Sequence, residues 1–435
     1  MSLSNERPLT GNGLLALLNA RVFDGHGAAL HDDWTVLVQG QHIAAAGSGV
    51  IVPSHARTVD CGGRVLLPGL IDAHVHVYAQ DVNLIRNETR PVTLLAQRAN
   101  VMLERTLLRG FTTVRDCGGA DFGLALAIEQ GWLRAPRLFW CGPMLSQTGG
   151  HGDLRHPRDR ENGGCGTDWS CMGGCGIIAQ AVDGEVAITK AIREQMRRGA
   201  SFVKFAASGG VTSVAGSVNA LQFSDREVRT IVEEVERHER YCTAHCHPDS
   251  GIRRAIELGV HCIEHASMIS PATARLAADR GTFIVPTIAV ATVIERFGAE
   301  LGYPPESLKK LVPVKAAMRE GLRTLRDAGV AVGFGTDLLG PLETHQRLEF
   351  AERAAVFTPV DILRQATSIN ARILRQEGRL GCVAPGAFAD LVLVDGNPLD
   401  DIAVLADAKI APALILKDGA IIHTALEIHM PAARQ

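Results

Sequence analysis

The strongest constraint on the fold is a regular alternation that runs from about Gly69 to Gln376. Short apolar runs of strand length alternate there with longer amphipathic segments of helical period. Such an alternation predicts parallel strands joined by crossover helices, and about 300 residues of it fit a (β/α)₈ barrel. The expected strands are Ile71–Val77, Thr112–Asp116, Arg137–Cys141, Phe202–Ala206, Tyr241–Cys246, Cys262–His265, Phe283–Pro286 and Ala331–Asp337. The expected helices include Thr93–Arg109, Val186–Gly199, Asp225–Arg240, Pro248–Leu258 and Val314–Ala328.

Both ends of the chain carry strand patterns instead, rich in Leu and Val with turn residues between them. We therefore expect an α/β protein in which residues 1–66 and 377–435 build one small β-sandwich beside a barrel of residues 67–376. The expected end strands are Leu14–Phe23, Trp34–Val38, His42–Gly47, Arg64–Leu67, Ala389–Val394, Ala413–Lys417 and Ala420–His423.

One long segment, Ser146–Asp183, interrupts this rhythm with nine glycines, three cysteines and few periodic apolar residues. It follows an apparent strand end, where the loops of a barrel shape the active site. We expect it to be an active-site loop. The spacing of Cys165, Cys171 and Cys175 lacks the paired pattern of a structural zinc site, so these cysteines are expected to be free thiols.

The composition excludes several classes of function. The chain has 435 residues, 46% of them hydrophobic and 21% charged, and a net charge of −3. No basic excess indicates nucleic acid or an anionic membrane surface, and no apolar stretch is long enough for a membrane span. The polar start lacks a signal-peptide pattern, and ten cysteines are too few for a disulfide scaffold. These features favour a cytoplasmic protein with a small-molecule substrate.

The run Ile71-Asp72-Ala73-His74-Val75-His76-Val77 carries the clearest chemistry. His74 and His76 alternate on a strand and point the same way, so both imidazoles can reach one metal ion. The pair lies late on the first barrel strand, at the end where barrel enzymes keep their chemistry.

Further strand ends carry matching groups, namely His245, His265 and Asp337. Four imidazoles and one carboxylate in register are typical of a divalent metal site, most naturally zinc. Lys204 lies within the apolar strand Phe202–Ala206, where a buried ammonium is costly without a partner. A neutral lysine amine can add carbon dioxide to give an anionic carbamate that bridges two cations; the alternative is a lysine that reaches the barrel mouth and pairs with a carboxylate.

Over nearly the whole chain, the sequence resembles the amidohydrolase superfamily of metal-dependent hydrolases. Within it, the sequence is similar to the branch of Xaa-Pro and Xaa-Arg dipeptidases that also contains ochratoxin-type amide hydrolases. The motifs that carry this resemblance are Pro68-Gly69-Leu70-Ile71-Asp72-Ala73-His74-Val75-His76, Thr148-Gly149-Gly150-His151-Gly152, Ser208-Gly209-Gly210-Val211, Ala244-His245-Cys246-His247 and Ala389-Asp390-Leu391-Val392.

The resemblance implies two Zn²⁺ ions, with other divalent metals as alternatives, and a homo-oligomer. His74, His76 and Asp337 would bind the buried ion, His245 and His265 the more exposed one, and carboxylated Lys204 both. A metal-bridging hydroxide would attack the amide carbonyl, and Asp337 would pass the proton to the leaving amine.

Substrate contacts are expected from His151 in the glycine-rich loop and from His247, two residues beyond His245 on the same strand face. Either imidazole could hydrogen-bond the carbonyl oxygen and stabilise the oxyanion, so both are candidate catalytic residues. Tyr78, just after the first strand, is a candidate pocket residue, and Arg155 could meet a substrate carboxylate.

These features favour an enzyme that hydrolyses the amide bond of a dipeptide or N-acyl amino acid. Barrel loops change readily, so a hydrolase of a xenobiotic amide, carbamate or urea on the same metal centre is one alternative. A mononuclear deaminase or cyclic-amide hydrolase is another, although those relatives usually lack the bridging lysine, which Lys204 would provide. A metal-free structural relative is a third alternative, which the six retained candidate ligands disfavour.

Overall fold

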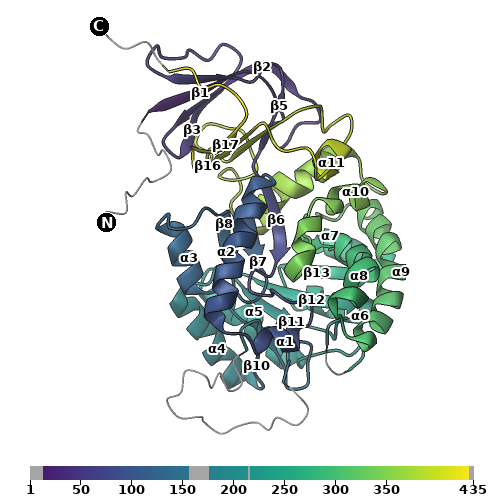
Figure 1. The fold of residues 1–435 in the computed structure, drawn as a ribbon. Coiled ribbons are helices and arrows are strands. Elements are labelled where there is room, and N and C mark those ends of the chain that lie inside the picture. The colour runs from purple at the N-terminus through teal and green to yellow at the C-terminus, as the bar shows by residue number, and fades with distance from the viewer. Residues whose placement is uncertain (1–12, 156–175, 214–215, 431–435) are drawn as a thin grey trace, which may run out of the picture.

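The computed structural model describes residues 13–155, 176–213 and 216–430. Its strands form parallel sheets surrounded by helices, and a separate mixed sheet lies at one end of the molecule (Figure 1).

The parallel strands lie in two sheets, and every pairing within them is parallel. The three-stranded sheet has the order β6 (Leu70–Val75), β7 (Phe111–Asp116), β8 (Arg137–Trp140). The six-stranded sheet has the order β10 (Ala179–Ala181), β9 (Met144–Ser146), β11 (Val203–Ala206), β12 (Cys242–Pro248), β13 (Cys262–Met268), β14 (Phe283–Val285).

Residues 331–337 connect the two sheets. Val332 pairs with Ile284 of β14 in parallel. On the other side, the Ala73 amide donates to the Phe334 carbonyl at 2.9 Å, and the Asp337 amide donates to the His74 carbonyl at 2.8 Å. Only Val332 has a strand pairing here, so the segment is more irregular than the continuous strand that the apolar run predicts. The order of strands is consistent with a (β/α)₈ barrel.

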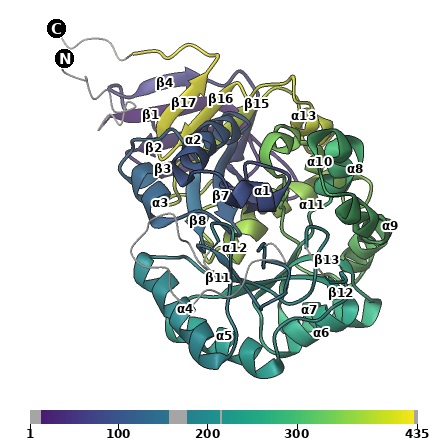
Figure 2. The same ribbon diagram turned by 60° about the horizontal axis from the view of Figure 1, so that its bottom comes forward.

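The helices lie outside the parallel strands (Figures 1 and 2). Their bounds are α1 (Leu84–Glu88), α2 (Val92–Leu108), α3 (Phe122–Glu129), α4 (Glu185–Arg198), α5 (Asp225–Arg237), α6 (Asp249–Glu257), α7 (Pro271–Arg280), α8 (Ala289–Leu301), α9 (Pro305–Asp327), α10 (Leu348–Ala354), α11 (Pro359–Arg364), α12 (Asn370–Ile373) and α13 (Ala403–Ala406). Local sequence fixes several ends; for example, Ser224 and Glu227 form a reciprocal capping box at the start of α5. In the described ranges, no helix combines the length and apolar character needed to cross a bilayer.

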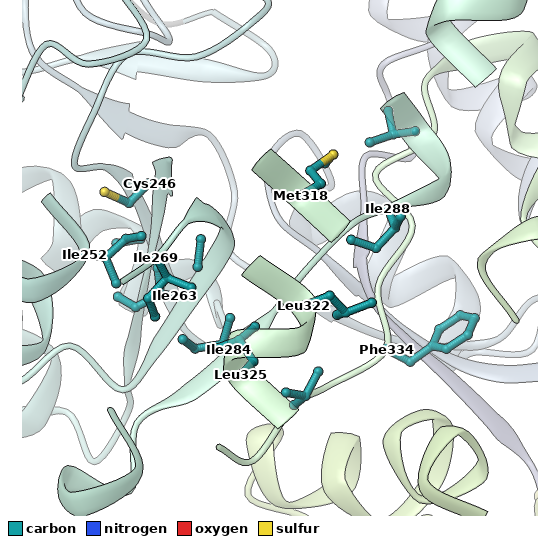
Figure 3. Packing of buried hydrophobic residues seen from close by; sticks show 14 of the residues in the cluster. Cys246, Ile252, Ile263, Ile269, Ile284, Ile288, Met318, Leu322, Leu325 and Phe334 are labelled. Carbon is teal, nitrogen blue, oxygen red and sulfur yellow. The ribbon is translucent and has the colours of Figure 1, made fainter. Parts of the chain in front are cut away.

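Helix α9 covers the strands with one apolar face. Met318, Leu322 and Leu325 are buried in the same cluster as Ile263 of β13 and Ile284 of β14 (Figure 3). The spacing of those three side chains is the helical period that predicts an amphipathic helix from Val314 onward. The helix nevertheless begins nine residues earlier, at Pro305, and passes through Pro313. A proline inside a helix removes a backbone donor, which is why sequence reasoning ends the helix there.

The mixed sheet contains strands from both ends of the chain, as the patterns predict. Its order is β17 (Ala420–Thr424), β16 (Leu414–Lys417), β15 (Leu391–Val394), β5 (Val65–Pro68), β1 (Leu14–Val22), β2 (His31–Gln39), β3 (His42–Gly47), with β4 (Arg57–Asp60) paired to β1. Strands β5 and β15 are antiparallel neighbours, with Leu66 opposite Leu393. Strand β4 was not expected, because four residues with only Val59 fully buried carry little periodicity.

Candidate metal centre

One cavity collects the chemistry-bearing side chains from the carboxyl ends of the parallel strands. This follows from the fold, because parallel strands end at the same edge of their sheets. The lining includes the eight predicted polar residues His74, His76, His151, Lys204, His245, His247, His265 and Asp337.

The tightest group is His74, His76 and Asp337. The Asp337 Oδ1 atom lies 3.5 Å from His74 Nε2 and 3.4 Å from His76 Nε2. One potential ligand atom from each of the three residues lies within 4.8 Å of the corresponding atoms of the other two. Two imidazole nitrogens and a carboxylate oxygen are ligands that suit zinc and similar divalent ions.

Each of these imidazoles is oriented by its second ring nitrogen. His74 Nδ1 lies 2.7 Å from Glu264 Oε2, and His76 Nδ1 lies 2.9 Å from the Gly118 carbonyl. A carbonyl only accepts, so His76 donates through Nδ1 and keeps the Nε2 lone pair toward Asp337. Such contacts fix ring orientation in metal sites.

Glu264 is part of a buried network that sequence reasoning missed. Its Oε1 accepts from Arg115 Nη2 at 2.6 Å and also contacts the Thr243 hydroxyl, and neither Arg115 nor Glu264 is exposed. Burial alone would raise the pKa of Glu264, but Arg115, Lys204 and His74 hold that pKa well below its usual range. The available signal was a carboxylate inside an apolar strand directly before His265.

Backbone conformation explains why neighbouring residues both reach the interior. On a regular strand, Glu264 and His265 would point to opposite faces. His265 instead has φ 69°, and Asp337 has φ 55°, values that are uncommon for residues other than glycine. Both candidate ligands therefore lie at strained positions, as functional residues often do.

His245 and His265 extend the group. Their ring centroids lie 4.6 Å apart, and the His265 ring lies 5.0 Å from that of His74. His245 Nε2 donates to the Gly209 carbonyl at 3.2 Å, which leaves Nδ1 with a free lone pair. His265 Nδ1 lies 2.8 Å from the Thr287 hydroxyl.

The imidazoles of this cavity are held in the neutral form that binds metal. Burial lowers the pKa of His74 to about 3 and that of His76 to about 4, and the charge of Lys204 contributes to both shifts. Burial also lowers the pKa of His245 and His265 well below the usual value. Neutral imidazoles offer their lone pairs without first losing a proton. Burial raises the pKa of Asp337 to about 7, against the opposing charge of Lys204.

Lys204 is 1% exposed and lies in β11, in which all four residues are buried. Its side chain lines the cavity beside the candidate ligands. The amine therefore lies among imidazoles and near the carboxylates of Glu264 and Asp337, on whose pKa values its charge acts.

The other predicted residues fall into two groups. His151 stacks on His245 with centroids 4.0 Å apart, and its Nδ1 lies 2.9 Å from the Ser213 hydroxyl. His247 lies 5.0 Å from His265 by ring centroids, and its Nδ1 lies 3.1 Å from the Ser267 hydroxyl. Both line the cavity.

Tyr78 and Arg155 are placed differently. The Tyr78 hydroxyl donates to Asp121 at 3.2 Å, and Tyr78 is not among the described residues that line the cavity. Arg155 binds the carboxylate of Asp153. The cysteines Cys165, Cys171 and Cys175 lie outside the described residues.

A second wall of the same cavity is apolar. It is formed largely by helices α8 and α9 and by the loops that follow the strands. Its residues are Leu84, Met144, Leu154, Ile178, Val211, Val290, Ala291, Ile294, Tyr303, Leu311, Val314, Met318 and Leu339. We call this set the apolar wall, and the eight polar residues named first the polar wall.

These features place the protein in the class of α/β proteins with a candidate metal centre at the ends of parallel strands. The chain belongs to the amidohydrolase family, whose sequence pattern it matches over residues 65–421.

Individual relatives agree with this assignment. The chain is 31% identical to ochratoxinase of Aspergillus niger over 385 residues, which cover 86% of this chain and 80% of that protein. It is similar to the crystal structure of an amidohydrolase with a TM-score of 0.91 and 37% identity, over 95% of this chain and 100% of the other. It is also similar to a prolidase crystallised with N-methylphosphonate-L-proline, with a TM-score of 0.89 and 40% identity over 94% and 99% of the two chains.

The resemblance seen in the sequence motifs is therefore confirmed, including the branch with prolidase-like and ochratoxinase-like proteins. The protein is a hydrolase that acts on amide or peptide bonds.

Proposed function

We propose that the protein is a binuclear zinc amidohydrolase that cleaves the amide bond of a dipeptide or an N-acyl amino acid, with ochratoxin-type amides among the candidates. The observation that carries this proposal is the convergence of His74, His76, Lys204, His245, His265 and Asp337 on one cavity.

In this proposal His74, His76 and Asp337 hold one ion, and His245 and His265 hold the other. Lys204, carboxylated by carbon dioxide, would supply an anionic ligand to both ions. The donor set fits because its imidazoles are neutral and oriented by Glu264, Gly118, Gly209 and Thr287. When bound, the two ions would activate a water molecule near neutral pH and polarise the amide carbonyl.

The remaining steps belong to side chains of the polar wall. Asp337 would accept the proton of the attacking water and give it to the leaving amine, the role of a carboxylate that lies beside the candidate ligands His74 and His76. His151 and His247 use Nδ1 for serine contacts, so Nε2 of each ring remains for the developing oxyanion. Burial lowers the pKa of His151 to about 3 and that of His247 to about 4, so they act as neutral donors.

A second candidate keeps this centre but changes the substrate to a xenobiotic amide, carbamate or urea. The apolar wall favours it, because an uncharged aryl or alkyl group would fit there. Lys204 in the cavity disfavours the mononuclear cyclic-amide hydrolases and deaminases.

We also propose that the parallel strands close into a (β/α)₈ barrel over residues 67–376, with a small β-sandwich built from residues 1–66 and 377–435. The hydrogen bonds of residues 331–337 to both β14 and β6 support closure, and the β5–β15 pairing supports the shared domain. A cytoplasmic location and a homo-oligomer complete the proposal. The seven cysteines of the described ranges are buried free thiols, which suits a reducing compartment.

The test combines metal content with a substrate panel, on protein purified with bicarbonate and zinc. The panel contains Xaa-Pro and Xaa-Arg dipeptides, N-acyl amino acids including ochratoxin A, and aryl carbamates. We expect two zinc ions per chain and activity that Lys204→Ala abolishes but that Lys190→Ala, on the surface helix α4, leaves intact. One ion or none, with Lys204→Ala fully active, would overturn the binuclear assignment.

A further inference from the structure

Tyr303 lies between α8 and α9 and carries a hydroxyl group that nothing in the described structure satisfies. The side chain is 3% exposed and lines the cavity of the candidate metal centre. Several buried side-chain polar atoms of the described residues have no hydrogen-bond partner, and among them only the Tyr303 hydroxyl belongs to a residue that lines this cavity.

A buried tyrosine hydroxyl normally finds a partner, because losing its water contacts without replacement is unfavourable. A phenylalanine at position 303 would fill the same space without that penalty. The orphaned group is therefore best explained by a partner that arrives with the substrate.

The surroundings of Tyr303 indicate which part of a substrate it would meet. The helices on either side of it contribute Val290 and Ile294 of α8 and Leu311 and Val314 of α9 to the lining of the same cavity. The Asp337 carboxylate lines the same cavity. Tyr303 thus shares this cavity with the group that would protonate the leaving amine and with the apolar wall.

The hydroxyl is a permanent donor. A tyrosine hydroxyl keeps its proton below about pH 10. It can therefore donate a hydrogen bond to an acceptor on a substrate throughout the neutral range of pH.

We propose that Tyr303 determines specificity by donating a hydrogen bond to an acceptor on the amine portion of the substrate, while the apolar wall holds a bulky apolar group of that same portion. This inference rests on the proposed amide hydrolysis and narrows its substrates to amides of apolar amino acids or of closely related amines. The acceptor is a carboxylate or an amide carbonyl attached next to the scissile nitrogen.

A purely structural role is the competing explanation, because the Tyr303 amide donates to the Gly298 carbonyl at 2.8 Å where α8 turns toward α9. Tyr303→Phe keeps the ring and that backbone contact and removes only the hydroxyl. Tyr241→Phe is a control for the loss of a buried tyrosine hydroxyl elsewhere, because Tyr241 is buried and does not line this cavity.

The experiment uses three substrates that share the N-acetyl and phenylethyl groups: N-acetyl-L-phenylalanine, its carboxamide, and N-acetyl-2-phenylethylamine, which lacks the acceptor. We expect Tyr303→Phe to raise KM roughly 10- to 100-fold for an acceptor-bearing substrate with little change in kcat. The substrate without the acceptor should change by less than about threefold, as should all three substrates with Tyr241→Phe. Comparison of the carboxylate with the carboxamide shows which acceptor is used.

Equal losses on all three substrates, or no loss on any, would overturn the inference. A binding measurement tests the Tyr303 inference separately from the proposed function. Calorimetry would give the dissociation constants of a non-hydrolysable ketomethylene analogue of N-acetyl-L-phenylalanine for the zinc-loaded wild-type enzyme and for Tyr303→Phe. If the wild-type enzyme cleaves none of the amides, amide hydrolysis of this class fails. The Tyr303 inference is then judged by binding alone: the dissociation constant of the analogue should be roughly 10- to 100-fold higher for Tyr303→Phe than for the wild-type enzyme.

Discussion

The two walls of the central cavity are built on different principles. On the polar wall, imidazole after imidazole is fixed by a specific partner, such as Glu264 for His74 and Thr287 for His265. The apolar wall consists of side chains from α8, α9 and several loops, which contribute shape and dryness but little directional bonding. The polar wall therefore tolerates almost no change, whereas the apolar wall can be altered one side chain at a time. This contrast suits a family in which one reaction serves many substrates.

The largest effect is expected where the polar wall performs the proton transfer. Asp337→Asn keeps the shape of the side chain but removes its basicity and weakens a proposed metal ligand, so kcat of the zinc-saturated enzyme should fall by about a thousandfold or more. Steady-state kinetics on the best substrate of the panel measures this. Asp121→Asn, which alters a carboxylate outside the cavity lining, is the control. A variant with near-normal kcat would show that another group moves the proton.

The next effect concerns support behind the polar wall. Glu264→Gln weakens the contacts to His74 and to the buried Arg115, so zinc affinity should fall by about 10- to 100-fold. The free energy of unfolding of the metal-free protein should also fall, by about 3 kcal/mol, because a buried guanidinium loses its counter-charge. Competition with a chelator measures the first quantity and urea denaturation the second. Unchanged zinc affinity would mean that His74 does not need this carboxylate.

The apolar wall should respond to shape rather than to charge. Val314→Phe would place a larger side chain on the cavity side of α9, where Val314 is fully buried. We expect kcat/KM for bulky substrates to fall by about tenfold relative to small ones. Val312→Phe is a matched control on the same helix, because Val312 is 68% exposed. An equal loss on small and bulky substrates would indicate damage to the fold instead of altered selectivity.

The smallest effect concerns a histidine outside the cavity, and it tests how much of the protein's sensitivity to acid comes from histidines other than those of the polar wall. His261 is a partly buried imidazole that does not line this cavity, and burial, aided by Arg375, lowers its pKa to about 4. The unfolded chain binds a proton at this residue below about pH 6.5, whereas the folded chain does not until about pH 4. Stability from the neutral ring is therefore present at high pH and is lost as the pH falls.

The free energy of unfolding of the wild-type protein should fall between about pH 8 and pH 6, and in His261→Gln this fall should be smaller by about 1 kcal/mol. Urea denaturation of the metal-free proteins at both pH values provides the comparison. Parallel pH profiles for the two proteins would assign the whole acid sensitivity to other groups, with the imidazoles of the polar wall as the first candidates.

The polar wall was largely predictable, and the apolar wall was not. Strand alternation and register bring His74, His76, His245 and His265 to one end of the sheets, and short apolar runs reveal those strands in the sequence. The apolar wall depends on helix α8 and on the first part of α9, which passes through Pro313. Helix packing of this kind leaves no fixed spacing between contacting residues, so sequence reasoning overlooked Tyr303.

Glu264 escaped notice for a different reason. Period-two alternation assigns residues 264 and 265 to opposite faces, and only the left-handed backbone at His265 places both inside. Local conformations of this kind depend on the surrounding tertiary structure, which a single sequence does not display.

The pairing of β5 with β15 has a consequence for the synthesis of the chain. Strand β5 lacks its neighbour β15 until more than 300 further residues have been made, since Pro68 pairs with Leu391. At about 5–20 residues per second, that interval lasts on the order of 15–60 seconds. During that time an unpaired strand edge is open to association with other nascent chains, a recognised route to aggregation. The order of synthesis thus makes the last strands of the protein the ones that protect the first.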